Sequence, residues 1–162
     1  MIQVQRAAGL RPQHLTEMRV CDVTRGPDVW RYVPPPAANK TLHLGKRSVF
    51  YFGPKSQVAL SPYLAGRSGE DYVFGCVVDR VFKRMSRDNY HRCIQAACRA
   101  AGIAPWHPHQ LRHALATAVA ERFQSLAHAA AAIGDNPATA AAVYVHVDPS
   151  ERARIEVARA MG

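Results

Sequence analysis

Four prolines mark where helices begin, and they do the most to limit what this chain can fold into. Each of these prolines precedes a helix-forming segment, and the four are Pro12, Pro54, Pro108 and Pro137. Proline suits the first position of a helix because the N–H that it lacks would have no partner there, and it disfavours helix interiors. The sequence therefore predicts several helices of moderate length.

The remaining local signals complete the predicted order of elements. Two short strands are expected at 29–33 and 48–52, where Val, Trp, Tyr and Phe favour extended backbone. Helices are expected over 1–8, 12–20, 55–65, 79–101 and 108–123, over an alanine-rich stretch that ends at Gly134, from Pro137 through Tyr144, and over 149–161. This order predicts a mostly helical α+β fold with a small antiparallel β-sheet inserted near the N-terminus, as one domain over 1–162.

Charge and cysteine spacing narrow the functional classes. Twenty-one Lys and Arg against twelve Asp and Glu give a net charge of +9, which favours a polyanionic partner, of which nucleic acid is the commonest. No apolar run of about 18 residues or signal peptide is present, so we expect no membrane span and a cytoplasmic protein. The cysteines form no CxxC pair. We therefore expect small buried thiols and no zinc site.

The stretch expected to form the helix 79–101 is strongly basic. It carries Lys83, Arg84 and Arg87 within five positions, followed by Arg92 and Arg99. Two interpretations are open for this segment. It is either a solvated helix face or a surface that contacts the phosphates of DNA.

The segment WHPHQLRHAL, residues 106–115, gathers three histidines and an arginine where a helix is expected to start at Pro108. His109 and Arg112 share one face of its first turn, where free N–H groups and the helix dipole favour an anion. Two other uses are open, a metal site and a simple helix cap. The glutamate of an HExxH motif is missing and Arg112 would repel a cation, which argues against metal. Arg11, held extended by Pro12, is the candidate second arm of a two-arginine phosphate clamp.

Four segments in this order resemble the tyrosine recombinases of the phage-integrase type. They are GLRPQHLTEMRVCDV (9–23), the lysine in ANKT (38–41), HPHQLRH (107–113) and IGDNPATAAAVYVH (133–146). The resemblance implies a catalytic domain that cuts and rejoins double-stranded DNA through a 3′-phosphotyrosyl intermediate. It implies neither metal nor another cofactor, and it implies tetramers of the protein on paired DNA sites.

The resemblance also implies a role for each matching residue. Arg11 and Arg112 would hold the scissile phosphate, and Lys40 would protonate the leaving 5′-oxygen. His109 would assist proton transfer, and Tyr144 would be the nucleophile. Taken singly, Lys40 is better explained as a solvent-facing turn residue, and Tyr144 as an ordinary half-buried tyrosine. The expected DNA-contacting residues are Arg11, Lys40, Lys83, Arg84, Arg87 and Arg112.

Three features depart from the family pattern. His14 replaces an acidic residue that usually supports the first arginine. Asp135 stands where the family has a histidine or tryptophan that donates a hydrogen bond to the phosphate, which an ionised aspartate cannot do. Asp135 should therefore oppose phosphate binding unless it is protonated or points away. The N-terminal DNA-clamping (core-binding) domain is expected to be absent, because little precedes Gly9.

These features leave more than one function open. The leading hypothesis is a site-specific recombinase from a mobile-element integrase. The alternative is a catalytically impaired DNA-binding remnant of an integrase, which is suggested by His14, Asp135 and the missing clamp domain. A metal-dependent hydrolase that uses the histidines is a third hypothesis.

Overall fold

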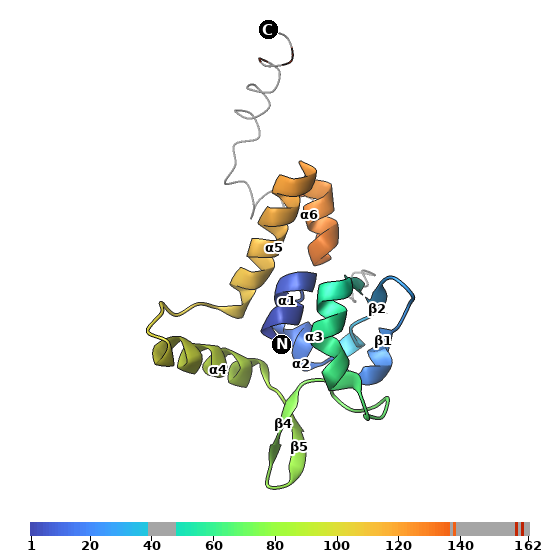
Figure 1. Ribbon diagram of the computed structural model, residues 1–162, viewed down its shortest axis with the longest axis vertical. Coiled ribbons are helices and arrows are strands. Elements are labelled where there is room, and N and C mark those ends of the chain that lie inside the picture. The colour runs from blue at the N-terminus through green and yellow to red at the C-terminus, as the bar shows by residue number, and fades with distance from the viewer. Residues whose placement is uncertain (39–47, 137, 139–157, 159, 161–162) are drawn as a thin grey trace.

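The computed structural model describes residues 1–38, 48–136, 138, 158 and 160, and helices dominate this part of the chain (Figure 1). The helices are α1 (Ile2–Ala8), α2 (Pro12–Thr16), α3 (Pro54–Leu64), α4 (Arg87–Ala100), α5 (Pro108–Phe123) and α6 (Leu126–Ile133), with short 3-10 turns at Val20–Asp22 and Pro36–Ala38. The mostly helical α+β prediction is confirmed. The helices expected after Pro137, together with Lys40 and Tyr144, lie outside the described residues.

The predicted small antiparallel sheet is present near the N-terminus. Its strands are β1 (Val23–Thr24), β2 (Trp30–Tyr32) and β3 (Phe50–Phe52), in the order β1-β2-β3, and β1 was not expected from the sequence. Tyr32 pairs with Phe50, and Trp30 pairs with Phe52. Phe50 and Phe52 are buried whereas Tyr51 between them is exposed, so one face of the sheet covers the core.

The main core joins α1, the sheet and one face of α4. Its largest fully buried side chains include Leu10, Leu15, Met18, Tyr32 and Phe52. From α4 it receives Tyr90, Ile94 and Cys98, which recur every four residues and so lie on one face of the helix. A smaller cluster of Ala116, Ala129, Ala130 and Ile133 joins α5 to α6. Alanine at these positions allows the two helices to approach closely.

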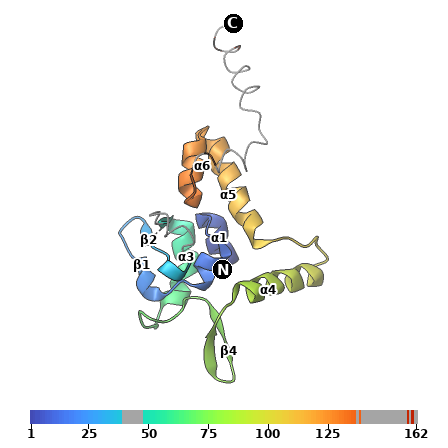
Figure 2. The same ribbon diagram turned by 180° about the vertical axis from the view of Figure 1, so that it is seen from behind.

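The predicted helix 79–101 is wrong in its first part. Residues 75–84 form a hairpin of β4 (Gly75–Val78) and β5 (Val81–Arg84), and α4 begins only at Arg87, where the Ser86 hydroxyl accepts a hydrogen bond from the Asn89 N–H. Asp79 and Arg80 have φ of 53° and 64°, as a two-residue type I′ hairpin turn requires. Valine and phenylalanine in both strands favour this extended form. The hairpin projects from the body of the protein in both views (Figures 1 and 2).

Two further predictions need correction. The helix expected over 12–20 ends at Thr16 and is followed by a 3-10 turn. Cys21, Cys76 and Cys93 are exposed, and Cys98 alone among the four cysteines is buried. Cys76 is exposed because it lies on the projecting hairpin instead of in a core.

Candidate functional site

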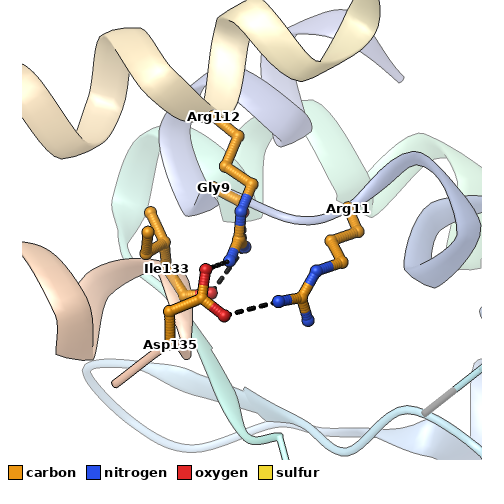
Figure 3. A network of polar contacts seen from close by, with 5 residues as sticks. All are labelled: Gly9, Arg11, Arg112, Ile133 and Asp135. Carbon is orange, nitrogen blue, oxygen red and sulfur yellow. Dashed lines mark hydrogen bonds and ion pairs between the residues drawn. The ribbon is translucent and has the colours of Figure 1, made fainter. Parts of the chain in front are cut away.

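Arg112 is the most deeply buried cation of the candidate site. It lies on α5, which begins at Pro108 as predicted and where the His107 N–H donates to the Gln110 side chain over 2.7 Å. The Arg112 side chain is only 4% exposed. Its Nη1 donates to the carbonyl oxygens of Gly9, at 2.7 Å, and Ile133, at 2.5 Å (Figure 3). Arg112 thus ties α5 to the end of α1 and the end of α6.

Gly9 makes this arrangement possible. It ends α1 in the left-handed conformation with φ 63°. A Cβ at this position would lie 2.9 Å from Leu115 Cδ2 and 3.0 Å from Ile133 Cγ2, which is closer than such atoms normally approach. Only a glycine therefore lets the α1 terminus approach α5 and α6 with its carbonyl aimed at Arg112. The sequence predicted that the first helix ends at residue 8, directly before Gly9, but it gave no sign of this acceptor role.

Arg11 reaches the same point from a different element. It has extended backbone, φ −67° and ψ 147°, directly before Pro12 at the start of α2, as expected for a residue that precedes proline. Its side chain is 32% exposed. The structure thus brings together two arginines separated by about a hundred positions, as the clamp hypothesis required.

Asp135 joins the two arginines. One carboxylate oxygen accepts from Arg11 Nη2 and the other from Arg112 Nη2, both at 2.5 Å (Figure 3). We call Arg11, Arg112 and Asp135 the arginine cluster. Asp135 does not point away from the site, because its carboxylate lies directly between the guanidinium groups. Two positive charges against one negative charge leave the cluster with a net charge of +1.

His14 lies beside the arginine cluster as an uncharged group. The residue is 1% exposed, its ring lies 5.0 Å from that of Phe50, and its Nδ1 has no hydrogen-bond partner in the described structure. Burial, reinforced by the charges of Arg11 and Arg112, lowers the pKa of His14 to about 3. Near neutral pH His14 adds no charge and cannot replace the acidic residue that the resemblance implies at this position.

His109 lies on the exposed side of α5, one turn before Arg112. Loss of solvation, followed by the charges of Arg112, His113 and other nearby cations, lowers its pKa from 6.5. A neutral imidazole near pH 7 is able to accept a proton. No group of three or more metal-ligating side chains occurs among the described residues, and no described helix is long and apolar enough to cross a membrane.

The residues expected to contact DNA outside the cluster divide between two elements. Lys83 and Arg84 lie on β5, and Arg87 is the first residue of α4. Arg84 already forms an ion pair with Glu17 and lies over the ring of Tyr72. Arg87 is exposed and lies 3.5 Å from the Asp88 carboxylate. These cations therefore form a hairpin base and a helix start, not one continuous helical stripe.

With this geometry in place, the comparisons with known proteins identify the class. Residues 1–151 match the sequence pattern of the family described as "Phage integrase family". The chain therefore belongs to this family, whose members act in DNA recombination. No curated relative matches the sequence.

Solved structures share the fold. XerA recombinase is 21% identical in sequence and superimposes with a TM-score of 0.65, and the match covers 98% of this chain and 55% of the XerA chain. The Tn1549 transposon integrase in complex with circular intermediate DNA is 16% identical with a TM-score of 0.72, over 96% and 57%. XerH bound to its difH substrate is 14% identical with a TM-score of 0.68, over 96% and 44%. The chain thus spans about half the length of the recombinases that it matches.

Proposed function

We propose that this protein cuts and rejoins double-stranded DNA at specific sites through a 3′-phosphotyrosyl intermediate, as the integrase of a mobile element. The observation that carries the proposal is the convergence of Arg11 and Arg112 on one anionic group, the Asp135 carboxylate. The Nη2 atom of each arginine lies 2.5 Å from one of its oxygens. Two guanidinium groups that bind separate oxygens of one anion are suited to a phosphodiester. Family membership and the net charge of +9 support DNA as the source of that phosphate.

The chemistry assigns a task to each proposed residue. A phenol with a pKa near 10 is ionised to about one part in a thousand at pH 7, a handicap of about 4 kcal/mol. Attack by Tyr144 therefore needs a proton acceptor and a positive site, and neutral His109 is the proposed acceptor. Charge grows on the phosphate during attack, so preorganised arginines stabilise the transition state more than the ground state. Lys40 is the proposed acid for the leaving 5′-oxygen.

The covalent link explains how rejoining proceeds without a nucleotide cofactor. The phosphotyrosyl bond conserves the energy of the broken diester, and attack by a 5′-hydroxyl on that bond releases Tyr144 and restores the strand. We propose that the protein assembles as a tetramer on paired DNA sites. Its work would be in the cytoplasm, on the nucleoid in a prokaryotic cell.

A DNA-binding remnant without cleavage activity is the second candidate, and the position of Asp135 favours it. A carboxylate about 5 Å from a phosphate costs about 3 kcal/mol at an effective dielectric near 20, or roughly a hundredfold in rate. Asp135 already occupies a donor of each arginine. On this hypothesis the protein binds DNA through its cations and forms no covalent adduct.

A suicide DNA substrate with a nick separates these functions on a denaturing gel. The proposed recombinase gives a covalent protein–DNA adduct that disappears in Tyr144→Phe. DNA binding without any adduct supports the remnant, and activity that EDTA abolishes supports the metal-dependent hydrolase. DNA binding itself should be weak and should fall steeply with salt. Equal binding at low and high salt would contradict the electrostatic account.

A further inference from the structure

The carboxylate of Asp135 uses the donors that a bound phosphate would need. Each of its oxygens accepts from the Nη2 of a different arginine at the same distance, 2.5 Å. The non-bridging oxygens of a phosphodiester would bind a pair of guanidinium groups in the same way. Because each Nη2 is engaged by Asp135, a phosphate can bind both groups fully only by moving this carboxylate.

The backbone holds Asp135 in this position. Gly134 ends α6 in the left-handed conformation with φ 63°, and the Asp135 N–H donates to the Ala130 carbonyl over 2.9 Å. The Ile133 carbonyl, two residues earlier, accepts from Arg112. The end of α6 therefore contacts the arginine cluster through both its backbone and the Asp135 side chain, so the contact is part of the fold and not a chance surface pair.

The exposure of the cluster leaves a route for competition. The Asp135 side chain is 19% exposed and that of Arg11 is 32% exposed, whereas Arg112 is 4% exposed. An anion from solution can thus approach from the side of Arg11 and Asp135. Arg112 keeps its bonds to the Gly9 and Ile133 carbonyls when the carboxylate leaves, so it remains positioned to bind the incoming anion.

From this geometry we infer that Asp135 is an internal counter-ion that positions Arg11 and Arg112 and competes with phosphate for them. The inference rests on the proposed function only in taking the two arginines as phosphate ligands. Asp135 is a positioning residue here. It keeps two guanidinium groups side by side in the absence of DNA, and it gives up at least one of them when a phosphate binds.

Inorganic phosphate tests this inference without any DNA chemistry. The Tm of the full chain is measured for wild type and Asp135→Asn in phosphate and in chloride at matched ionic strength. Asp135→Asn should have the lower Tm in chloride, because the guanidinium groups then repel each other. Phosphate should raise its Tm by about 5 °C, because the anion occupies the vacated position. The wild-type Tm should respond much less.

Glu17→Gln is the matched control, because it also frees an arginine, Arg84, from a carboxylate, but on the hairpin surface. An equal response to phosphate in Glu17→Gln and Asp135→Asn would overturn the inference. Adding Arg11→Gln to Asp135→Asn should abolish the rise in Tm that phosphate causes. A rise that persists in the double variant would also overturn the inference. If Asp135→Asn folds only in phosphate, the inference is supported. If it fails to fold in phosphate as well, phosphate does not replace the carboxylate and the inference is wrong.

A second readout connects the inference to the reaction. On the suicide substrate, Asp135→His should give more covalent adduct than wild type, because it removes the competing charge and adds a hydrogen-bond donor. An unchanged or lower yield, with the phosphate response intact, would mean that Asp135 does not limit cleavage. If no variant forms an adduct, the proposed function fails while the Tm measurements still decide the role of Asp135.

Discussion

The arginine cluster and the β4–β5 hairpin both place arginines beside carboxylates, yet they differ in how those charges are held. In the cluster, Arg112 is 4% exposed and donates to two carbonyls as well as to Asp135. On the hairpin, Arg84 is 37% exposed beside Glu17. The side chains of the cluster come from three separate segments of the chain, at Arg11, Arg112 and Asp135. The comparison indicates that burial, and not the number of ion pairs, decides which arginines the fold depends on.

The hairpin is also stabilised in a more local way. Val77 is 69% exposed and Val81 is 58% exposed, so its strands bury little apolar surface. A Cβ on Gly75 would lie 2.4 Å from Phe82 Cζ, so the Phe82 ring covers this glycine across the strand pair. Arg67 in turn lies over the Phe82 ring at 4.4 Å. Substitutions on the hairpin should therefore have smaller and more independent effects than those in the cluster.

The largest expected effect is that of Arg112→Met. It leaves Asp135 without its buried partner and the Gly9 and Ile133 carbonyls without a donor, so we expect a loss of about 3–5 kcal/mol in the free energy of unfolding. Arg84→Met on the hairpin should cost no more than about 1 kcal/mol. Urea unfolding of both variants measures the contrast. Equal losses in the two variants would show that burial does not decide how much each arginine contributes to stability.

Gly9→Ala should have the second largest effect, a loss of about 2–4 kcal/mol in the free energy of unfolding. The loss comes from the left-handed backbone and from the close contacts of the added Cβ with Leu115 and Ile133. Gly66→Ala is the matched control, because Gly66 has φ 69° but no atom within 4 Å of the added Cβ. This control should cost about 1–2 kcal/mol, the backbone part alone. The same loss in both variants would show that the close approach of α1 to α5 and α6 contributes nothing.

His14 should make stability depend on pH. Its pKa is about 3 in the folded protein and 6.5 when exposed, so between these values the unfolded chain binds the extra proton. The contribution of His14 to the free energy of unfolding is therefore complete above pH 6.5. Below that pH it falls by about 1 kcal/mol per pH unit. In urea unfolding between pH 4 and pH 7, the difference between wild type and His14→Gln should change with this slope. A constant difference would contradict a neutral, buried His14 beside the cluster.

The sequence predicted the elements whose signals are local. The helix starts at Pro12, Pro54 and Pro108 are confirmed because proline and the residue before it determine the backbone there. The hairpin was missed because its turn residues, Asp79 and Arg80, are not the usual Asn-Gly pair. Local pattern therefore failed where an uncommon pair of residues adopts positive φ.

The arginine cluster was predicted only in part. The local pattern and the resemblance both selected Arg11 and Arg112, and the structure brings them to one carboxylate. Sequence spacing could not show that this carboxylate, Asp135, points inward, because its direction depends on the end of α6 packing against α1 and α5. The acceptor role of the Gly9 carbonyl was missed for the same reason, since a backbone oxygen carries no sequence signal. The roles of Lys40 and Tyr144 stay predictions.

The smallest expected effect is the coupling between Glu17 and Arg84, which sharpens the contrast with the cluster. Both side chains are partly exposed, at 21% and 37%, so water and salt screen their attraction. A double-mutant cycle of Glu17→Gln and Arg84→Gln should give a coupling of about 0.5 kcal/mol that largely disappears in 1 M NaCl. The same cycle on Asp135→Asn and Arg112→Gln should give a larger coupling that persists in salt, because Arg112 is shielded from solvent. Equal salt sensitivity of the two couplings would mean that burial does not separate the cluster from the hairpin.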